Sequence, residues 1–207
     1  MTSTPIFQDR IDAGLELCKH LQHYKNVDGI TLAVPRGGVP VALPVAKILQ
    51  VPLEIILSKK IGHPKHKELA IGAVSLTGQI VSPNALVSDE YIQQETLHIR
   101  EQLKAMYAKY MGDKKPTPVK GKVVIIIDDG VATGHTLLST IEMIRHEGPR
   151  KIVIAVPVAS KQAAQKLSEV VDEFVCVWIP SHFHSVGEFY TDFTQVSDEE
   201  VVSMLTG

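Results

Sequence analysis

Short runs of consecutive apolar residues alternate along the chain with longer stretches in which apolar residues recur at every third or fourth position. Such runs are typical of strands, and the periodic stretches are typical of amphipathic helices. The expected strands are 30–34, 53–58, 70–75, 79–81, 123–127, 152–158 and 174–178. The expected helices are 7–24, 39–49, 88–110, 137–144, 161–170 and a short one that starts at 197. This alternation predicts a single α/β domain over residues 1–207, with a mostly parallel, twisted sheet flanked by helices.

Two of the expected helices have a distinctive pattern. In the first, Ile11, Leu15, Cys18 and Leu21 are expected to form the apolar stripe. In the second, Pro44 removes a backbone donor and crowds the preceding turn, so we expect either a kink or a later helix start there.

Three segments rich in polar residues, glycine or proline follow expected strands, at 35–38, 59–69 and 128–136. Ligands of parallel α/β sheets bind beyond the carboxyl ends of the strands. We therefore expect these segments to meet around one site. Glycine and proline punctuate residues 61–69, which predicts a loop there.

The segment 128–136 places two acids, small residues and hydroxyls directly after the apolar strand 123–127. The start of the next helix offers unpaired N–H groups and a partial positive charge, which suit a phosphate group. Two adjacent carboxylates repel a phosphate group, and they bind hydroxyl groups or a metal ion. Ribose 5-phosphate has a phosphate group for the helix start and hydroxyl groups for the carboxylates. The glycine spacing matches neither the Walker A loop nor the dinucleotide-binding motif GxGxxG.

Composition narrows the possible partners. The chain has a formal net charge of −2, with 44% hydrophobic and 21% charged residues, so general binding to nucleic acid or to an acidic membrane is not expected. Its start, MTSTPIFQDR, lacks the pattern of a signal peptide, and no apolar run approaches membrane-spanning length. We expect a cytoplasmic location. The cysteines, Cys18 and Cys176, are expected to be buried thiols that bind no metal and form no disulfide.

The sequence VVIIIDDGVATGHT at 123–136 resembles the phosphoribosyl pyrophosphate signature of the type I phosphoribosyltransferases. His135 stands where that family more often has a small residue. PRGG at 35–38, the lysine pair Lys59-Lys60 and the segment GEFYTDFTQVSDEEV at 187–201 resemble stand-alone bacterial members whose substrate is often unassigned. The resemblance spans nearly the whole chain and implies a small hood formed mainly by residues 179–207, with a contribution from the N-terminal helix.

The resemblance implies a role for each matching residue. Asp128 and Asp129 would hold the ribose hydroxyls and, directly or through water, Mg²⁺. Arg36, Gly37 and Gly38 would hold the pyrophosphate, in a loop that in this family often contains a non-proline cis peptide. Lys59 or Lys60 would meet pyrophosphate charge, and residues 61–80 resemble the mobile loop that closes over the reaction. The turn that would hold the 5-phosphate consists of Gly130, Val131, Ala132, Thr133, Gly134, His135 and Thr136.

The acceptor is less well defined by the sequence. Members that act on 6-oxopurines carry a carboxylate where this chain has Ala132, so hypoxanthine and guanine are disfavoured and adenine stays possible. Trp178, Phe183 and Tyr190 are candidates for stacking on an acceptor beneath the hood. For Trp178 and Tyr190, packing in the core is an equal alternative.

The resemblance implies transfer of the 5-phosphoribosyl group from phosphoribosyl pyrophosphate to a nitrogenous base or similar acceptor, by a homodimer that uses Mg²⁺. The catalytic candidates are Arg36, Lys59, Lys60, Asp128 and Asp129. A non-catalytic regulator that binds phosphoribosyl pyrophosphate would use the same pocket. A hydrolase acting on a related sugar phosphate is disfavoured, because the sequence contains no evident pair of nucleophile and base.

Overall fold

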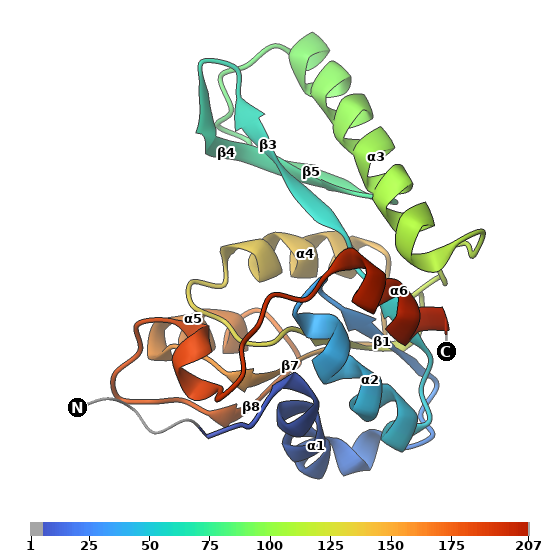
Figure 1. The fold of residues 1–207 in the computed structure, drawn as a ribbon. Coiled ribbons are helices and arrows are strands. Elements are labelled where there is room, and N and C mark those ends of the chain that lie inside the picture. Colours follow the sequence, from blue (N-terminus) through green and yellow to red (C-terminus); the bar gives the residue numbers. More distant parts are fainter. Residues whose placement is uncertain (1–5, 207) are drawn as a thin grey trace.

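The computed structural model describes residues 6–206, and its centre is a parallel five-stranded sheet in the order β2-β1-β6-β7-β8. Its strands are β1 (Gly29–Ala33), β2 (Leu53–Ile55), β6 (Val123–Ile127), β7 (Lys151–Val158) and β8 (Glu173–Trp178). Helices α1 (Arg10–Leu21) and α2 (Gly38–Leu49) cover one face, and α4 (His135–His146) and α5 (Lys161–Ser168) cover the other (Figure 1). The predicted α/β architecture is confirmed.

Strand β6 shows why its sequence is continuously apolar. Ile125 and Ile127 pack with α1 and α2, whereas Val124 and Ile126 pack with α4 and α5. Side chains of a strand alternate between faces, so a central strand covered on both sides needs apolar residues at every position. This packing places Asp128 at a fixed point just beyond the strand.

The stripe that α1 buries differs from the expected one. The buried residues are Arg10, Ala13, Gly14, Leu17, Cys18 and Leu21. Ile11 and Leu15 are 37% and 45% exposed, so their assignment to the stripe was wrong. The reason is the close approach of α2: a Cβ on Gly14 would overlap the carbonyl oxygen of Val41. The contact turns α1 so that Gly14 faces the core, which brings Arg10 inward as well.

Helix α2 begins at Gly38 and continues through Pro44 to Leu49. The alternative of a later helix start is therefore wrong. Both cysteines are free, Cys18 buried and Cys176 half-buried, and burial raises the pKa of each thiol to about 11.

A second, antiparallel sheet replaces the expected loop at 61–69. It consists of β3 (Ser58–His63), β4 (His66–Ser75) and β5 (Gln79–Val81), and with α3 (Asp89–Met111) it projects from the central sheet (Figure 1). The proline of the segment lies in the short turn between β3 and β4. Gly62 lies at a register shift, where a Cβ would come within 2.5 Å of the carbonyl oxygen of Lys67. The outer end of β4 is exposed, and its first three residues, 66–68, are polar and resemble a loop in the sequence.

The C-terminal segment runs irregularly along the core, as expected, and contains the short 3-10 helix η2 (Val186–Phe189) before α6 (Asp198–Thr206). Phe7, Phe189 and Tyr190 are buried together in a small third apolar cluster. Helix α6 packs on α2 and α3. The role of this segment as a hood stays a prediction. Among the described residues, no helix is both long enough and apolar enough to cross a membrane.

Candidate active site

A cleft of about 850 Å³ opens beyond the carboxyl ends of β1 and β2 and reaches the start of α4. Its lining includes Arg36 from the loop after β1, Lys59 from β3 and Thr136 from α4. Helices α3 and α6 close the opposite side. The structure thus brings one residue from each of the three predicted segments to a common cleft.

The loop 35–38 packs directly against the end of β6. Its Pro35–Arg36 peptide is cis, as the resemblance implied. A Cβ on Gly37 would overlap a carboxylate oxygen of Asp129, and one on Gly38 would lie 2.6 Å from the carbonyl oxygen of Ile127. Only glycine fits this contact, so the loop and the acid pair form one continuous surface.

The two acids beyond β6 have different surroundings. The side chain of Asp128 accepts a hydrogen bond from the backbone N–H of Asp129 (2.9 Å) and has no ion-pair partner among the described residues. Burial raises the pKa of Asp128 well above its ordinary value, and the neighbouring Asp129 carboxylate raises it further. Burial also raises the pKa of Asp129, but Arg10 opposes that rise. Asp128 is therefore the acid whose charge is least compensated in the site.

Arg10, which the sequence did not indicate, contacts the candidate acid Asp129. Its Nε lies 2.8 Å from Oδ2 of Asp129, and its Nη1 donates to the carbonyl oxygen of Thr194 (2.8 Å). Its guanidinium carbon lies 3.9 Å from the ring centre of Phe193. Arg10 is only 9% exposed, so this ion pair is largely shielded from water. The one available signal was its spacing of four and seven residues from Gly14 and Leu17, the buried face of α1.

Backbone hydrogen bonds fix the start of the turn 130–136, and most of its other residues are exposed. Val131 is buried and exchanges backbone hydrogen bonds with Val158 and Ser160, each 2.9 Å long. Gly134 has a φ of 76° and immediately precedes α4, which begins at His135. Ala132, Thr133, His135 and Thr136 are exposed. The first N–H groups of α4 have no intrahelical partners and so are available to an anion.

The two lysines of the predicted pair diverge, because successive side chains of a strand point to opposite faces. Lys59 lines the cleft, with its Nζ 2.7 Å from Oε1 of Gln102 on α3. Lys60 instead pairs with Glu68 on β4 at 2.9 Å and does not line the cleft. Lys59 is therefore the lysine placed to meet a ligand there.

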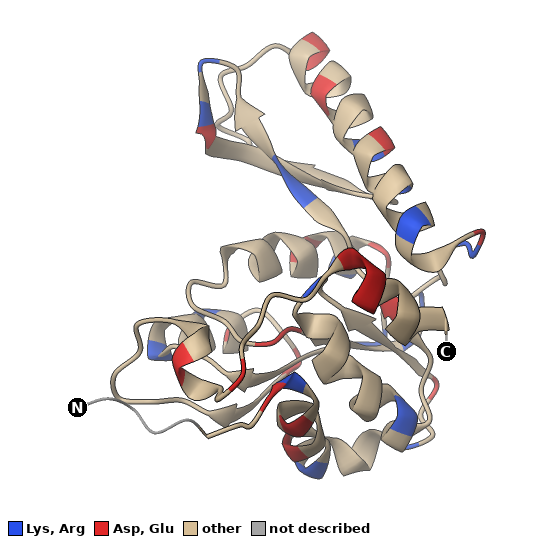
Figure 2. Cartoon of the chain, viewed as in Figure 1, with Lys and Arg blue, Asp and Glu red and all other residues tan. Residues whose placement is uncertain are grey.

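An ion cluster that the sequence did not indicate borders Arg36. Asp198 accepts from Lys109 (2.6 Å) and from the Tyr110 hydroxyl (2.5 Å), and it lies 3.7 Å from Nη1 of Arg36. Figure 2 shows the acidic first turn of α6 beside the basic end of α3. Hydrogen bonds from Lys109 and Tyr110 lower the pKa of Asp198, so it stays charged against these cations. Lys109 adds a third cation to the cleft.

The aromatic candidates for the acceptor lie outside this cleft. Tyr190 is 4% exposed, between Phe7 and Phe193, and its hydroxyl donates to the backbone carbonyl of Asp129 (2.6 Å). It has no free face for a base, so of its two alternatives the structure favours core packing. Phe183 stacks on Phe189 at 5.6 Å. Trp178 is 48% exposed at the end of β8.

Together, the doubly covered parallel sheet, the helix-start turn and the acid pair define an α/β protein whose strand ends present N–H donors suited to a phosphate group near carboxylates suited to hydroxyl groups. The chain belongs to the phosphoribosyltransferase family, because the family model of the phosphoribosyl transferase domain matches residues 13–194.

The chain is also similar to individual proteins. Two curated proteins from strains of Mycobacterium tuberculosis, each named "Putative phosphoribosyl transferase", are 35% identical over 205 residues, which cover 97% of this chain and 46% of theirs. The chain thus spans about half the length of these relatives. The crystal structure of a Thermus thermophilus protein, TT1426, is 36% identical, with a TM-score of 0.85 over 96% of this chain and 97% of that one. A hypothetical protein from Neisseria gonorrhoeae, 13% identical with a TM-score of 0.51, shares the fold alone.

Proposed function

We propose that the chain transfers the 5-phosphoribosyl group from phosphoribosyl pyrophosphate to a nitrogenous base or similar acceptor. A nitrogen–C1 bond forms, the bond from C1 to the pyrophosphate oxygen breaks, and the nitrogen loses a proton. The single observation that best supports the proposal is the packing of Gly37 on Asp129. This contact places the loop that we assign to the pyrophosphate beside the acids that we assign to the ribose. In the ligand, the pyrophosphate and the ribose are likewise joined, at C1.

The residues act chiefly by positioning charge. The N–H groups at the start of α4 would hold the 5-phosphate, and Asp128 would accept hydrogen bonds from the ribose hydroxyls. Arg36 and Lys59 would face the departing pyrophosphate, whose negative charge grows as the bond breaks. Fixed donors and cations aimed at developing charge stabilise a transition state without reorganising during the reaction.

Mg²⁺ fits this donor set as an ion held mainly by the ligand. Within residues 6–206, no three His, Cys, Asp or Glu side chains come together as a metal site. One free carboxylate, Asp128, is sufficient for Mg²⁺, which usually keeps several waters and takes substrate phosphates as ligands. When bound, it would neutralise pyrophosphate charge. Asp129 is a weaker candidate, because Arg10 occupies one of its oxygens.

The alternative is a regulator that binds phosphoribosyl pyrophosphate without turning it over. Incubation with phosphoribosyl pyrophosphate, Mg²⁺ and a panel of nucleobases distinguishes the two. Pyrophosphate release that depends on one base supports the transferase. Calorimetric binding with no release for any base supports the regulator, and absence of binding contradicts both. By family resemblance we further propose a cytoplasmic homodimer, which light scattering checks for its dimeric state.

Lys59→Ala is expected to raise the KM for phosphoribosyl pyrophosphate about tenfold, because a charge-assisted contact worth about 1.4 kcal/mol is lost. Lys60→Ala is the matched control, since its side chain pairs with Glu68 outside the cleft. We expect its KM to stay within about twofold of the unmodified chain. Steady-state kinetics of both variants measure the difference, and equal effects would contradict the assignment of Lys59.

A further inference from the structure

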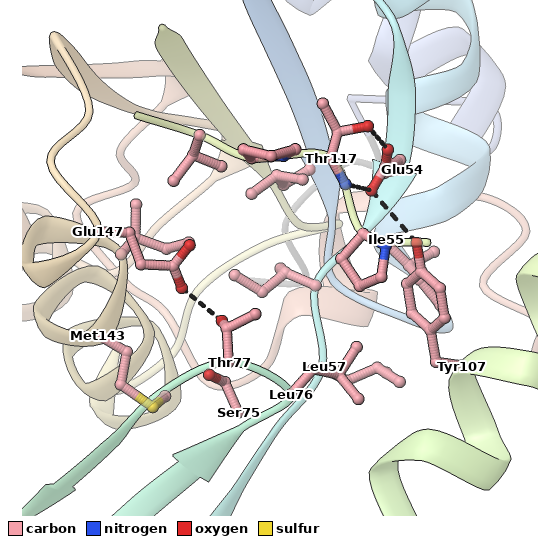
Figure 3. A pocket seen from close by; sticks show the side chains of 16 residues that line it. Glu54, Ile55, Leu57, Ser75, Leu76, Thr77, Tyr107, Thr117, Met143 and Glu147 are labelled. Carbon is pink, nitrogen blue, oxygen red and sulfur yellow. Dashed lines mark hydrogen bonds between the residues drawn. The ribbon is translucent and has the colours of Figure 1, made fainter. Parts of the chain in front are cut away.

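A second pocket, of about 220 Å³, lies at the junction between the central sheet and the projecting sheet (Figure 3). Its walls come from the β2–β3 connection, the β4–β5 turn, the end of α4 and the segment 116–119 before β6. Ile56 and Leu57 line both this pocket and the cleft, and so form the partition between them. None of the candidate residues for phosphoribosyl transfer lines it.

Most of the lining is apolar. Leu57, Leu76, Val119 and Met143 surround the space, and Figure 3 shows several of these side chains pointing into it. An apolar cavity of about 150 Å³ is large enough to hold benzene, so this one can take a single ring with a short substituent.

Two carboxylates in the lining have only neutral partners. Glu147 accepts from the hydroxyl of Thr77 (2.5 Å), and Glu54 accepts from Thr117 and from the Tyr107 hydroxyl. Within the described part of the chain, neither glutamate has a cation within 4.0 Å. Glu54 already accepts three hydrogen bonds, whereas Glu147 accepts one and retains most of its capacity.

The position of Glu147 adds to its attraction for a cation. It is the C-terminal cap of α4, where the helix dipole places partial negative charge. The basic residues of the same turn are directed elsewhere. Arg145 lies near Asp172 and donates to the carbonyl oxygen of Val170, and His146 contacts the carbonyl oxygen of Glu142.

We propose that this pocket binds a small organic cation, with its apolar group between Leu76 and Met143 and its ammonium group on Glu147. The positive charge of the ammonium group would be stabilised by the Glu147 carboxylate and by the C-terminal end of α4. The apolar group would be removed from water. The site is independent of phosphoribosyl transfer, so the proposal stands or falls separately from the proposed function.

Benzylammonium is a suitable probe, since it has one ring and one primary ammonium group, and benzyl alcohol is its neutral counterpart. In ¹⁵N-resolved NMR titrations of the full chain, we expect benzylammonium to shift the backbone amides of residues 75–77, Thr117, Val119 and 143–147. Benzyl alcohol should bind at least fivefold more weakly. Equal affinity of the two probes, shifts confined to other regions, or no saturable shift with either probe would overturn the proposal.

Glu147→Gln keeps the shape of the side chain and removes its charge, and we expect it to weaken benzylammonium binding about tenfold. Glu142→Gln, on an exposed position of the same helix, is the matched control and should leave the affinity unchanged. Leu76→Trp should fill the pocket and abolish the shifts. Unchanged affinity in folded Glu147→Gln, or retained binding in Leu76→Trp, would refute the site.

Discussion

Replacing Asp128 by Asn is expected to lower phosphoribosyl transfer about a hundredfold, a loss of about 2.7 kcal/mol in transition-state stabilisation. The carboxylate is the acceptor we assign to the ribose hydroxyls, and hydrogen bonds to a charged group are stronger than those to a neutral amide. Asparagine retains the size of the side chain and one acceptor oxygen. The loss should therefore come from charge rather than from collapse of the site, and kcat/KM for phosphoribosyl pyrophosphate measures it.

The same substitution is expected to stabilise the fold at neutral pH. Burial and the Asp129 carboxylate raise the pKa of Asp128 in the folded chain above its value in the unfolded chain. Between these two pKa values the folded state binds more protons, so its stability falls as the pH rises through that interval. The Asn variant lacks this loss. In urea unfolding, the free energy of unfolding of the Asn variant should equal that of the unmodified chain below about pH 4 and should exceed it by a growing amount as the pH rises.

Asp113→Asn is the control for this pH dependence, because Asp113 is exposed. Its free energy of unfolding should follow that of the unmodified chain at every pH. An Asp128→Asn variant that retains full activity would remove Asp128 from the site. A variant that is less stable at neutral pH would show that the Asp128 charge is compensated in the fold.

Local patterns were sufficient to predict the centre of the fold and the meeting of three candidate segments at its strand ends. A strand covered on both faces requires an unbroken apolar run, and the turn at 128–136 carries its acids, glycines and hydroxyls within one short segment. The β3–β4 hairpin had no comparable pattern. Its outer end is exposed, so polar residues occur at successive positions and the period of two is lost.

The missed contacts share a different cause. Arg10 and Asp129 lie 119 residues apart in the sequence, and Lys109 and Asp198 lie 89 apart. The packing of α1 on α2 and on the central sheet, and of α6 on α3, brings them together. Tyr190 is an aromatic residue in a polar segment, so in the sequence it resembles a ligand-binding residue. In the structure its hydroxyl donates to the backbone carbonyl of Asp129, a contact that also depends on packing between elements. Sequence patterns do not report which charges meet across elements, and in α1 they also misplaced part of the buried face.

Arg10→Met is expected to lower the free energy of unfolding by about 3 kcal/mol, because removing one partner leaves the Asp129 charge buried without compensation. Methionine retains apolar volume beside Phe193, so little of this loss should come from packing. Lys19→Met is the matched control, since Lys19 lies on the same helix and pairs with Glu16 on the exposed surface. Surface pairs of this kind contribute about 1 kcal/mol or less.

The pH dependence distinguishes loss of the ion pair from a general packing defect. Arg10 opposes the rise in the pKa of Asp129 that burial causes, so its removal should raise that pKa further. The folded variant then retains a proton on Asp129 to higher pH than the unfolded chain does. Its stability deficit should therefore be small at acidic pH and increase as the pH rises. A deficit of the same size at all pH values in urea unfolding would assign Arg10 to packing, and the ion pair would no longer explain how Asp129 is held beyond β6.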